Sequence, residues 1–203
     1  MNIHLHFLGG AGTVTGSKHL IEANKRKILI DCGLFQGIKA LRLLNWENFP
    51  VNPQQIECVI LTHGHLDHVG YLPLLVRQGF KGTIYANEPT IEIAKLVLLD
   101  SARIQEEDAI RANENGYSKH HPARPLYTTD DVKAVFPLFQ PCTMSEWQDL
   151  GGSFAFRFRP NAHILGSSFV ELRLENTLLV ASGDVGRTED QLMFPAEKPF
   201  KAD

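Results

Sequence analysis

The stretch Thr62–His68, with the sequence THGHLDH, decides the fold because it places three histidines and one aspartate within six residues. It continues an apolar segment, Cys58–Thr62, that is typical of a short buried strand. A tight loop at the end of a strand can turn His63 and His65 to one metal ion and the remaining two side chains to a second. Neutral imidazoles and a carboxylate suit Zn²⁺ or a similar divalent ion. The alternative, a solvated histidine-rich turn, does not explain so many ligands directly after an apolar strand.

The composition is that of an ordinary globular protein of 203 residues, enough for one domain with a substantial core or two small ones. Its 20 Lys and Arg residues against 23 Asp and Glu residues give a net charge of −3, which argues against a small basic DNA-binding module. Its 3 cysteines include no CxxC pair, which argues against a disulfide framework or a cysteine zinc knuckle. The sequence shows neither a signal peptide nor a membrane span. We therefore expect a cytoplasmic protein without membrane association.

Apolar patterning predicts an α/β fold with strands towards both ends of the chain and helices in the middle. The segments expected to form strands are Ile3–Leu8, His19–Glu22, Lys27–Asp31, Cys58–Thr62, Thr83–Ala86, Ser153–Arg159, Phe169–Leu174 and Leu178–Ser182. The segments expected to form helices are Tyr71–Gln78, Pro89–Arg111 and Asp130–Phe139. The polar segment Asn113–Pro125, rich in helix-breaking residues, predicts a surface loop.

Three further motifs stand in a fixed order around the histidine-rich stretch. They are LIDCG with Asp31, NAHILGS with His163 and SGDVGR with Asp184. Together with HxHxDH, this order resembles the metallo-β-lactamase superfamily over residues 3–190. The sequences VTGS at Val14–Ser17 and LFQG at Leu34–Gly37 are most similar to the β-CASP branch, which contains RNA-processing nucleases.

The resemblance implies an αββα sandwich with a dinuclear zinc site. The implied ligands are His63, His65 and His163 for one ion, Asp67 and His68 for the other, and Asp184 for both. Such a pair of ions activates a shared water and holds phosphate oxygens during its attack. Asp67 or Asp184 would orient the hydroxide, and Asp31 would hold a ligand imidazole in one tautomer. Taken alone, Asp31 and Asp184 are also compatible with turn formation, and His163 with a buried structural histidine.

The chain departs from the family pattern towards its C-terminal end. In the β-CASP branch a cap domain follows the motif that contains Asp184, and the returning chain supplies a further ligand histidine; here no histidine follows His163. We therefore interpret residues 1–203 as the N-terminal portion of a lactamase-like domain, without the cap and the final part of the fold. The second metal site then lacks a ligand, so we expect at most one firmly held ion and little or no RNA hydrolysis. The net charge of −3 separately predicts weak RNA binding. A smaller departure is Ala162, where the family usually has glycine.

These motifs favour metal-dependent hydrolysis of RNA phosphodiesters, with RNA as the substrate of the full-length enzyme. Two alternatives stay open: hydrolysis of a small thioester or lactone, and a non-catalytic, metal-stabilised fragment that binds a partner. The flanking β-CASP-like motifs favour RNA over the small substrates, whereas the chain length favours the non-catalytic interpretation. The sequence also leaves a homodimer open.

Overall fold

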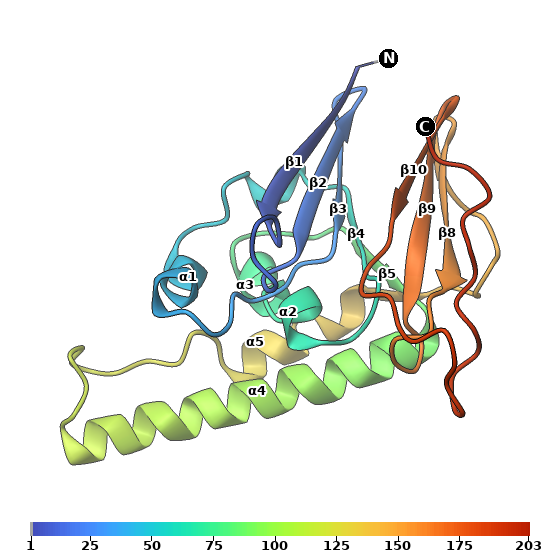
Figure 1. The fold of residues 1–203 in the computed structure, drawn as a ribbon. Helices are drawn as coiled ribbons and strands as arrows, with labels where there is room; N and C mark the ends of the chain where they lie inside the picture. The colour runs from blue at the N-terminus through green and yellow to red at the C-terminus, as the bar shows by residue number, and fades with distance from the viewer. Residues whose placement is uncertain (1) are drawn as a thin grey trace.

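The computed structural model describes residues 2–203 as two β-sheets packed face to face, with helices on the outer side of the first sheet (Figure 1). The first sheet has the strand order β1 Ile3–Gly9, β2 Lys18–Ala23, β3 Arg26–Ile30, β4 Cys58–Ile60, β5 Thr83–Ala86 and β6 Phe139–Pro141. The second sheet has the order β10 Thr177–Ala181, β9 Ser168–Leu174, β8 Phe154–Pro160 and β7 Gln148–Gly151. The α-helices are α1 Lys39–Leu43, α2 Leu66–Val69, α3 Leu72–Arg77, α4 Glu88–Asn115 and α5 Thr129–Lys133, and the 3₁₀ helices are η1 Leu44–Trp46, η2 Pro53–Gln55 and η3 Phe136–Leu138. The predicted α/β class is confirmed.

Strand direction places the histidine-rich stretch at an edge of the first sheet. Strands β1 to β3 pair antiparallel, whereas β3 to β6 run parallel. Ile30 at the end of β3 pairs with Ile60 at the end of β4. Asp31 and Thr62–His68 therefore leave the sheet side by side at the carboxyl ends of parallel strands, which is where α/β proteins commonly hold ligands.

Successive side chains along the central strands point to opposite faces of the first sheet, and this divides the core into two layers. One face of β3 and β4 packs against the second sheet, and this layer includes Ile28, Ile30, Ile60, Phe154, Phe156 and Phe158. The opposite face packs against the helices, and this layer includes Leu29, Val59, Leu61, Leu72, Leu75 and Leu98. Both faces of these strands are buried, as expected for parallel strands covered on two sides.

The sequence predicted a tight loop over the whole histidine-rich stretch, but the structure shows a loop only in its first half. Its second half forms the short helix α2, with His65 in extended conformation at the N-cap. Asp67 and His68 therefore lie on a helical turn, whereas His63 precedes it. His63 thus precedes the turn and His68 lies on it, yet their rings remain neighbours, with centroids 4.0 Å apart.

Two other predicted segments differ in extent from the structure. The prediction of one helix over Asp130–Phe139 is wrong, because Pro137 lies in η3 and the chain then enters β6. Helix α4 is longer than predicted and ends where Gly116 adopts the left-handed φ of +64°. With 28 residues α4 is long enough to cross a bilayer, but no helix within residues 2–203 is also apolar enough to do so.

Candidate metal centre

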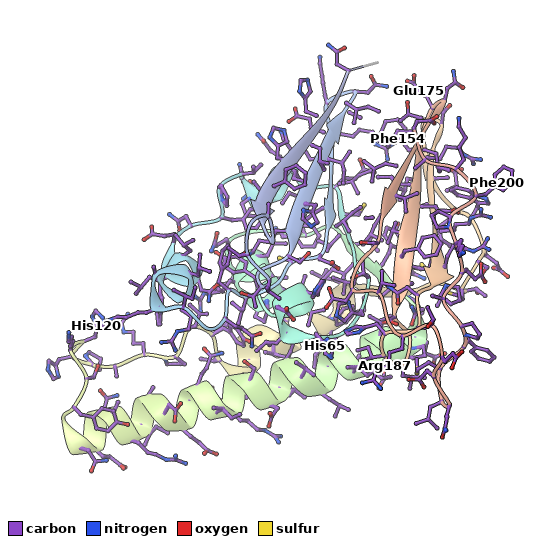
Figure 2. The ribbon with its side chains drawn as sticks, in the orientation of Figure 1. His65, His120, Phe154, Glu175, Arg187 and Phe200 are labelled. Atoms are coloured by element: carbon purple, nitrogen blue, oxygen red, sulfur yellow. The ribbon has the colours of Figure 1, made fainter. Side chains whose placement is uncertain are left out.

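Loops from both sheets carry four of the predicted ligands to one point. Figure 2 shows His65 at the end of the sandwich remote from the two chain termini. His63 Nε2 and His163 Nε2 each lie 3.1 Å from His65 Nδ1. With a carboxylate oxygen of Asp184, these nitrogens all lie within 4.8 Å of one another. Three imidazoles and one carboxylate form a donor set that suits Zn²⁺ or a similar divalent ion, so the residues present fit a metal.

The protonation of these imidazoles is compatible with metal binding. Burial, followed by the neighbouring imidazoles, lowers the pKa of His63 to about 2. Burial also lowers the pKa of His163, with Asp184 opposing the shift. Both rings are therefore neutral at physiological pH, and each keeps a nitrogen lone pair that a metal can accept.

Asp31 lies buried behind His68 and accepts hydrogen bonds from two residues of the histidine-rich stretch. His68 donates from Nδ1 to Asp31 Oδ2 at 2.7 Å, and Thr62 donates its backbone N–H and its hydroxyl at 2.8 and 2.9 Å. Because the Thr62 proton is engaged by Asp31, the Thr62 oxygen can accept the Nδ1 proton of His63 at 3.1 Å. Both imidazoles then turn Nε2 towards the site. The sequence analysis identified Asp31 but missed Thr62, although Thr62 begins the decisive stretch.

Asp184 lies between two imidazoles of the group of four, those of His63 and His163, and the imidazole of His68. One oxygen, Oδ2, lies 3.9 Å from His63 Nε2 and 3.6 Å from His163 Nε2. The other, Oδ1, lies 3.3 Å from His68 Nε2. Asp184 therefore offers one oxygen to each of the two groups of imidazoles, which is the arrangement that a bridging ligand requires.

Asp67 stands next to His68 on α2, outside the group of four. Burial disfavours the charged form of His68, but three nearby carboxylates, including that of Asp67, outweigh this and raise the pKa of His68. The backbone of Asp67 is tightly packed: its carbonyl accepts the N–H of Ser17 at 2.9 Å, and a Cβ added at Gly33 would lie 1.6 Å from this carbonyl oxygen. Metal ligation by Asp67 stays a prediction.

The turn after β8 presents His163. The hydroxyl of Ser167 accepts the backbone N–H groups of His163 and Ile164, both at 3.0 Å, and so closes the turn. Ala162 adopts a φ of +62°, in the left-handed region that favours glycine, which explains why glycine is the usual residue here. Gly186 packs against the same turn, and a Cβ at Gly186 would lie 1.6 Å from the Ala162 carbonyl oxygen.

A model of the metallo-beta-lactamase superfamily matches residues 12–201. The chain belongs to this superfamily. The resemblance inferred from the motifs is thereby confirmed. Among solved structures, the metallo-beta-lactamase fold protein YhfI from Bacillus subtilis covers 90% of this chain with a TM-score of 0.51 and 16% identity, and the match spans 61% of YhfI. At this identity the likeness concerns the fold alone.

Curated relatives of this superfamily member include a ribonuclease, a transcription termination factor and a cleavage and polyadenylation factor. Ribonuclease TTHA0252 of Thermus thermophilus is 35% identical over 96% of this chain and 41% of its own length. Transcription termination factor FttA of Methanocaldococcus jannaschii is 27% identical over 98% of this chain and 30% of its own length. Cleavage and polyadenylation specificity factor 73 of Drosophila melanogaster is 27% identical over 94% of this chain and 26% of its own length. These relatives agree with the β-CASP branch predicted from the motifs, and the chain spans less than half of each of them.

Proposed function

We propose that this chain is the metal-binding part of a metal-dependent RNA phosphodiesterase. The observation that carries the proposal is the convergence of four potential ligands, within 4.8 Å of one another, in a superfamily member whose relatives include a ribonuclease. The metal that these donors suit best is Zn²⁺. The ligands proposed for the first ion are His63, His65, His163 and Asp184, and those for the second are Asp67, His68 and Asp184.

The chain's own groups prepare these ligands before any metal arrives. Asp31 keeps the proton of His68 on Nδ1, and Thr62 does the same for His63. When bound, the metals would supply a water that ionises near neutral pH and positive charge for the phosphate oxygens. Asp67 or Asp184 would accept a hydrogen bond from the attacking water and orient it; the Asp184 side chain is 47% exposed, so a substrate can reach it.

The two ions are not expected to bind equally. Within residues 2–203, the second ion has only Asp67, His68 and the shared Asp184 as proposed donors. Three protein ligands can hold zinc when water fills the remaining position, so binding is weakened rather than prevented. We therefore propose one firmly held ion, a second weakly held ion and slow cleavage by this chain.

The same proposal includes a substrate, a location in the cell and an oligomeric state. RNA is the proposed substrate, and a cytoplasmic location agrees with Cys32, Cys58 and Cys142, which are all free and buried. The association of two copies stays a prediction.

The test combines metal analysis with a comparison of substrates. After extensive dialysis, elemental analysis of the purified chain should find one zinc ion per chain. With zinc added back, the chain should cleave end-labelled single-stranded RNA, and a chelator should stop the cleavage. A model thioester and a model lactone, assayed in parallel, should be hydrolysed more slowly. Hydrolysis of either small substrate without RNA cleavage, or the absence of tightly bound metal, would contradict the proposal.

A further inference from the structure

Ser17 lies immediately before β2 and contacts both segments that surround Asp31. Its backbone N–H donates to the Asp67 carbonyl at 2.9 Å, and its own carbonyl accepts the N–H of Gly33 at 2.9 Å. Its hydroxyl donates to Asp31 Oδ2 at 3.3 Å. This is the same carboxylate oxygen that accepts Nδ1–H of His68. Ser17 is itself buried, so its hydroxyl competes little with bulk water for this carboxylate.

His19, two residues further on in β2, continues the hydrogen-bond network beyond Ser17. Its Nε2 lies 3.4 Å from the Ser17 hydroxyl oxygen. Because the single Ser17 proton is donated to Asp31, His19 Nε2 must carry a proton and donate it to Ser17. Burial lowers the pKa of His19, although Asp31 opposes the shift, and this favours the neutral ring with one proton that the geometry requires.

The remaining contacts of His19 are compatible with a hydrogen bond from its ring to Ser17. Its Nδ1 is buried and has no hydrogen-bond partner among residues 2–203, so no competing bond turns the ring away. Phe7 packs edge-on against the ring, with centroids 5.5 Å apart and an interplanar angle of 79°. Ser17 and His19 both line a cavity of about 370 Å³ that also reaches His68 and Asp184.

We propose that Ser17 and His19 are positioning residues of the metal centre, acting through Asp31. The chain of donors runs from His19 Nε2–H to Ser17, and from the Ser17 hydroxyl to Asp31. By engaging Oδ2, it orients the Asp31 carboxylate so that His68 keeps its proton on Nδ1 and its lone pair on Nε2, facing Asp184. The functional part of this inference rests on the proposed metal site, whereas the position of the His68 proton can be measured without a metal.

The first test observes the His68 ring directly in the metal-free protein. With ¹⁵N-labelled histidine, NMR nitrogen shifts report which ring nitrogen carries the proton. At a pH high enough to keep the His68 ring neutral, the wild-type chain should show its single proton on Nδ1. Ser17→Ala removes the hydroxyl, and His19→Phe keeps an aromatic ring against Phe7 but removes the donor. Each variant should shift His68 towards a mixture of the two tautomers.

Two controls separate positioning from a general loss of structure. His19→Gln retains an amide donor near the place of Nε2 and should restore the wild-type spectrum of His68. Ser101→Ala removes a half-buried hydroxyl that pairs with Tyr127 at 2.8 Å, away from the site, and should leave that spectrum unchanged. If His68 keeps a wild-type spectrum in both Ser17→Ala and His19→Phe, the inference is wrong.

Zinc titration then relates the positioning to the metal. Residues that hydrogen-bond behind metal ligands typically change affinity by about 10–100-fold, and we expect about a tenfold loss for the weaker ion in Ser17→Ala and His19→Phe. The firmly held ion should change less, because none of its imidazoles contacts Asp31 directly and only His63 is linked to it, through Thr62. If wild-type protein binds zinc but does not cleave RNA, the proposed function fails while this inference stands. Equal weakening of both ions in the two variants would contradict the assignment to His68.

Discussion

Replacing Gly33 by alanine would place a methyl group inside the backbone of the turn that carries Asp67 and His68. A Cβ at this position would lie 1.6 Å from the Asp67 carbonyl oxygen, 2.0 Å from its carbonyl carbon and 2.6 Å from the backbone nitrogen of His68. Ordinary van der Waals contact begins at 3.4 Å, so the Asp67 carbonyl oxygen would have to move away from the new Cβ by about 1.8 Å. The obstacle is backbone rather than a flexible side chain, so a change of rotamer cannot relieve it.

The cost follows from the hydrogen bonds that this retreat would break. Three backbone bonds hold α2 against its neighbours: Ser17 N–H to the Asp67 carbonyl, Cys32 N–H to the His68 carbonyl and Leu34 N–H to the Leu66 carbonyl. At roughly 0.5–1.5 kcal/mol each, the loss of all three would lower the free energy of unfolding by about 1.5–4.5 kcal/mol. Metal sites tolerate ligand displacements of only about 0.2 Å, so the weaker ion would no longer bind.

Denaturant unfolding of the metal-free chain and zinc titration would measure both effects. Gly37→Ala is the control, because Gly37 has a left-handed φ of +72° and no heavy atom within 4 Å of an added Cβ. It should cost only the roughly 1–2 kcal/mol of a left-handed non-glycine residue and leave zinc binding unchanged. If Gly33→Ala proves no more costly than Gly37→Ala and binds zinc like the wild type, the packing argument is refuted.

Three further predictions concern the imidazoles and the carboxylate behind them. His163→Ala should lower the affinity for the firmly held zinc ion by more than roughly 100-fold, which is the largest loss expected for a residue that only supports a ligand. His120→Ala, in an exposed loop, should leave the zinc titration unchanged. Asp31→Asn, which suits the left-handed φ of +58°, should lower the pKa of His68 in an NMR titration, because the raising effect of the charge is lost. The metal-free chain should lose stability as the pH falls below about 6.5, where His63 of the unfolded chain takes up a proton. In the folded protein His63 stays neutral until its pKa of about 2. Unfolding curves of His63→Gln should therefore show a smaller loss of stability over this pH range.

Strands and the long helix were predictable because burial leaves a periodic signal in the sequence. In β8, Phe154, Phe156 and Phe158 are buried while Arg157 between them is partly exposed, and this alternation is visible without a structure. Short elements carry too few residues to show a period. Helix α2 has only 4 residues and no side-chain cap, so its backbone conformation depends on contacts with the turn after β3.

The candidate ligands were predictable for a different reason, namely that imidazoles and carboxylates in a recurring order indicate metal chemistry. The residues that support them gave no such signal. Thr62 contacts Asp31 because Asp31 adopts a left-handed φ of +58° and turns its carboxylate back towards the end of β4. Nothing in the local sequence indicates which aspartate adopts that conformation, so Thr62 could be recognised only in three dimensions.

The two sheets position their candidate ligands by the same local packing. In the first sheet, Asp31 follows β3 and Gly33, two residues later, packs against the backbone of the histidine-rich stretch. In the second sheet, Asp184 follows β10 and Gly186, two residues later, packs against the turn that carries His163. Each carboxylate is thus followed by a glycine whose missing side chain lets two backbones meet. A side chain at either glycine would separate a carboxylate from the imidazoles that it serves.

This arrangement places the candidate metal centre at a junction between the sheets. His63 and His65 follow the first sheet, whereas His163 follows β8 of the second, so an ion held by all three would link the two halves. The protein already joins them here through the N–H of Ser168, which donates to the Thr62 carbonyl at 2.9 Å. Because the two sheets must be packed together before the three imidazoles can meet, part of the binding energy of a metal at this site would stabilise that packing. Removing the metal should therefore loosen the contact between the sheets before it disturbs the order of strands within either one.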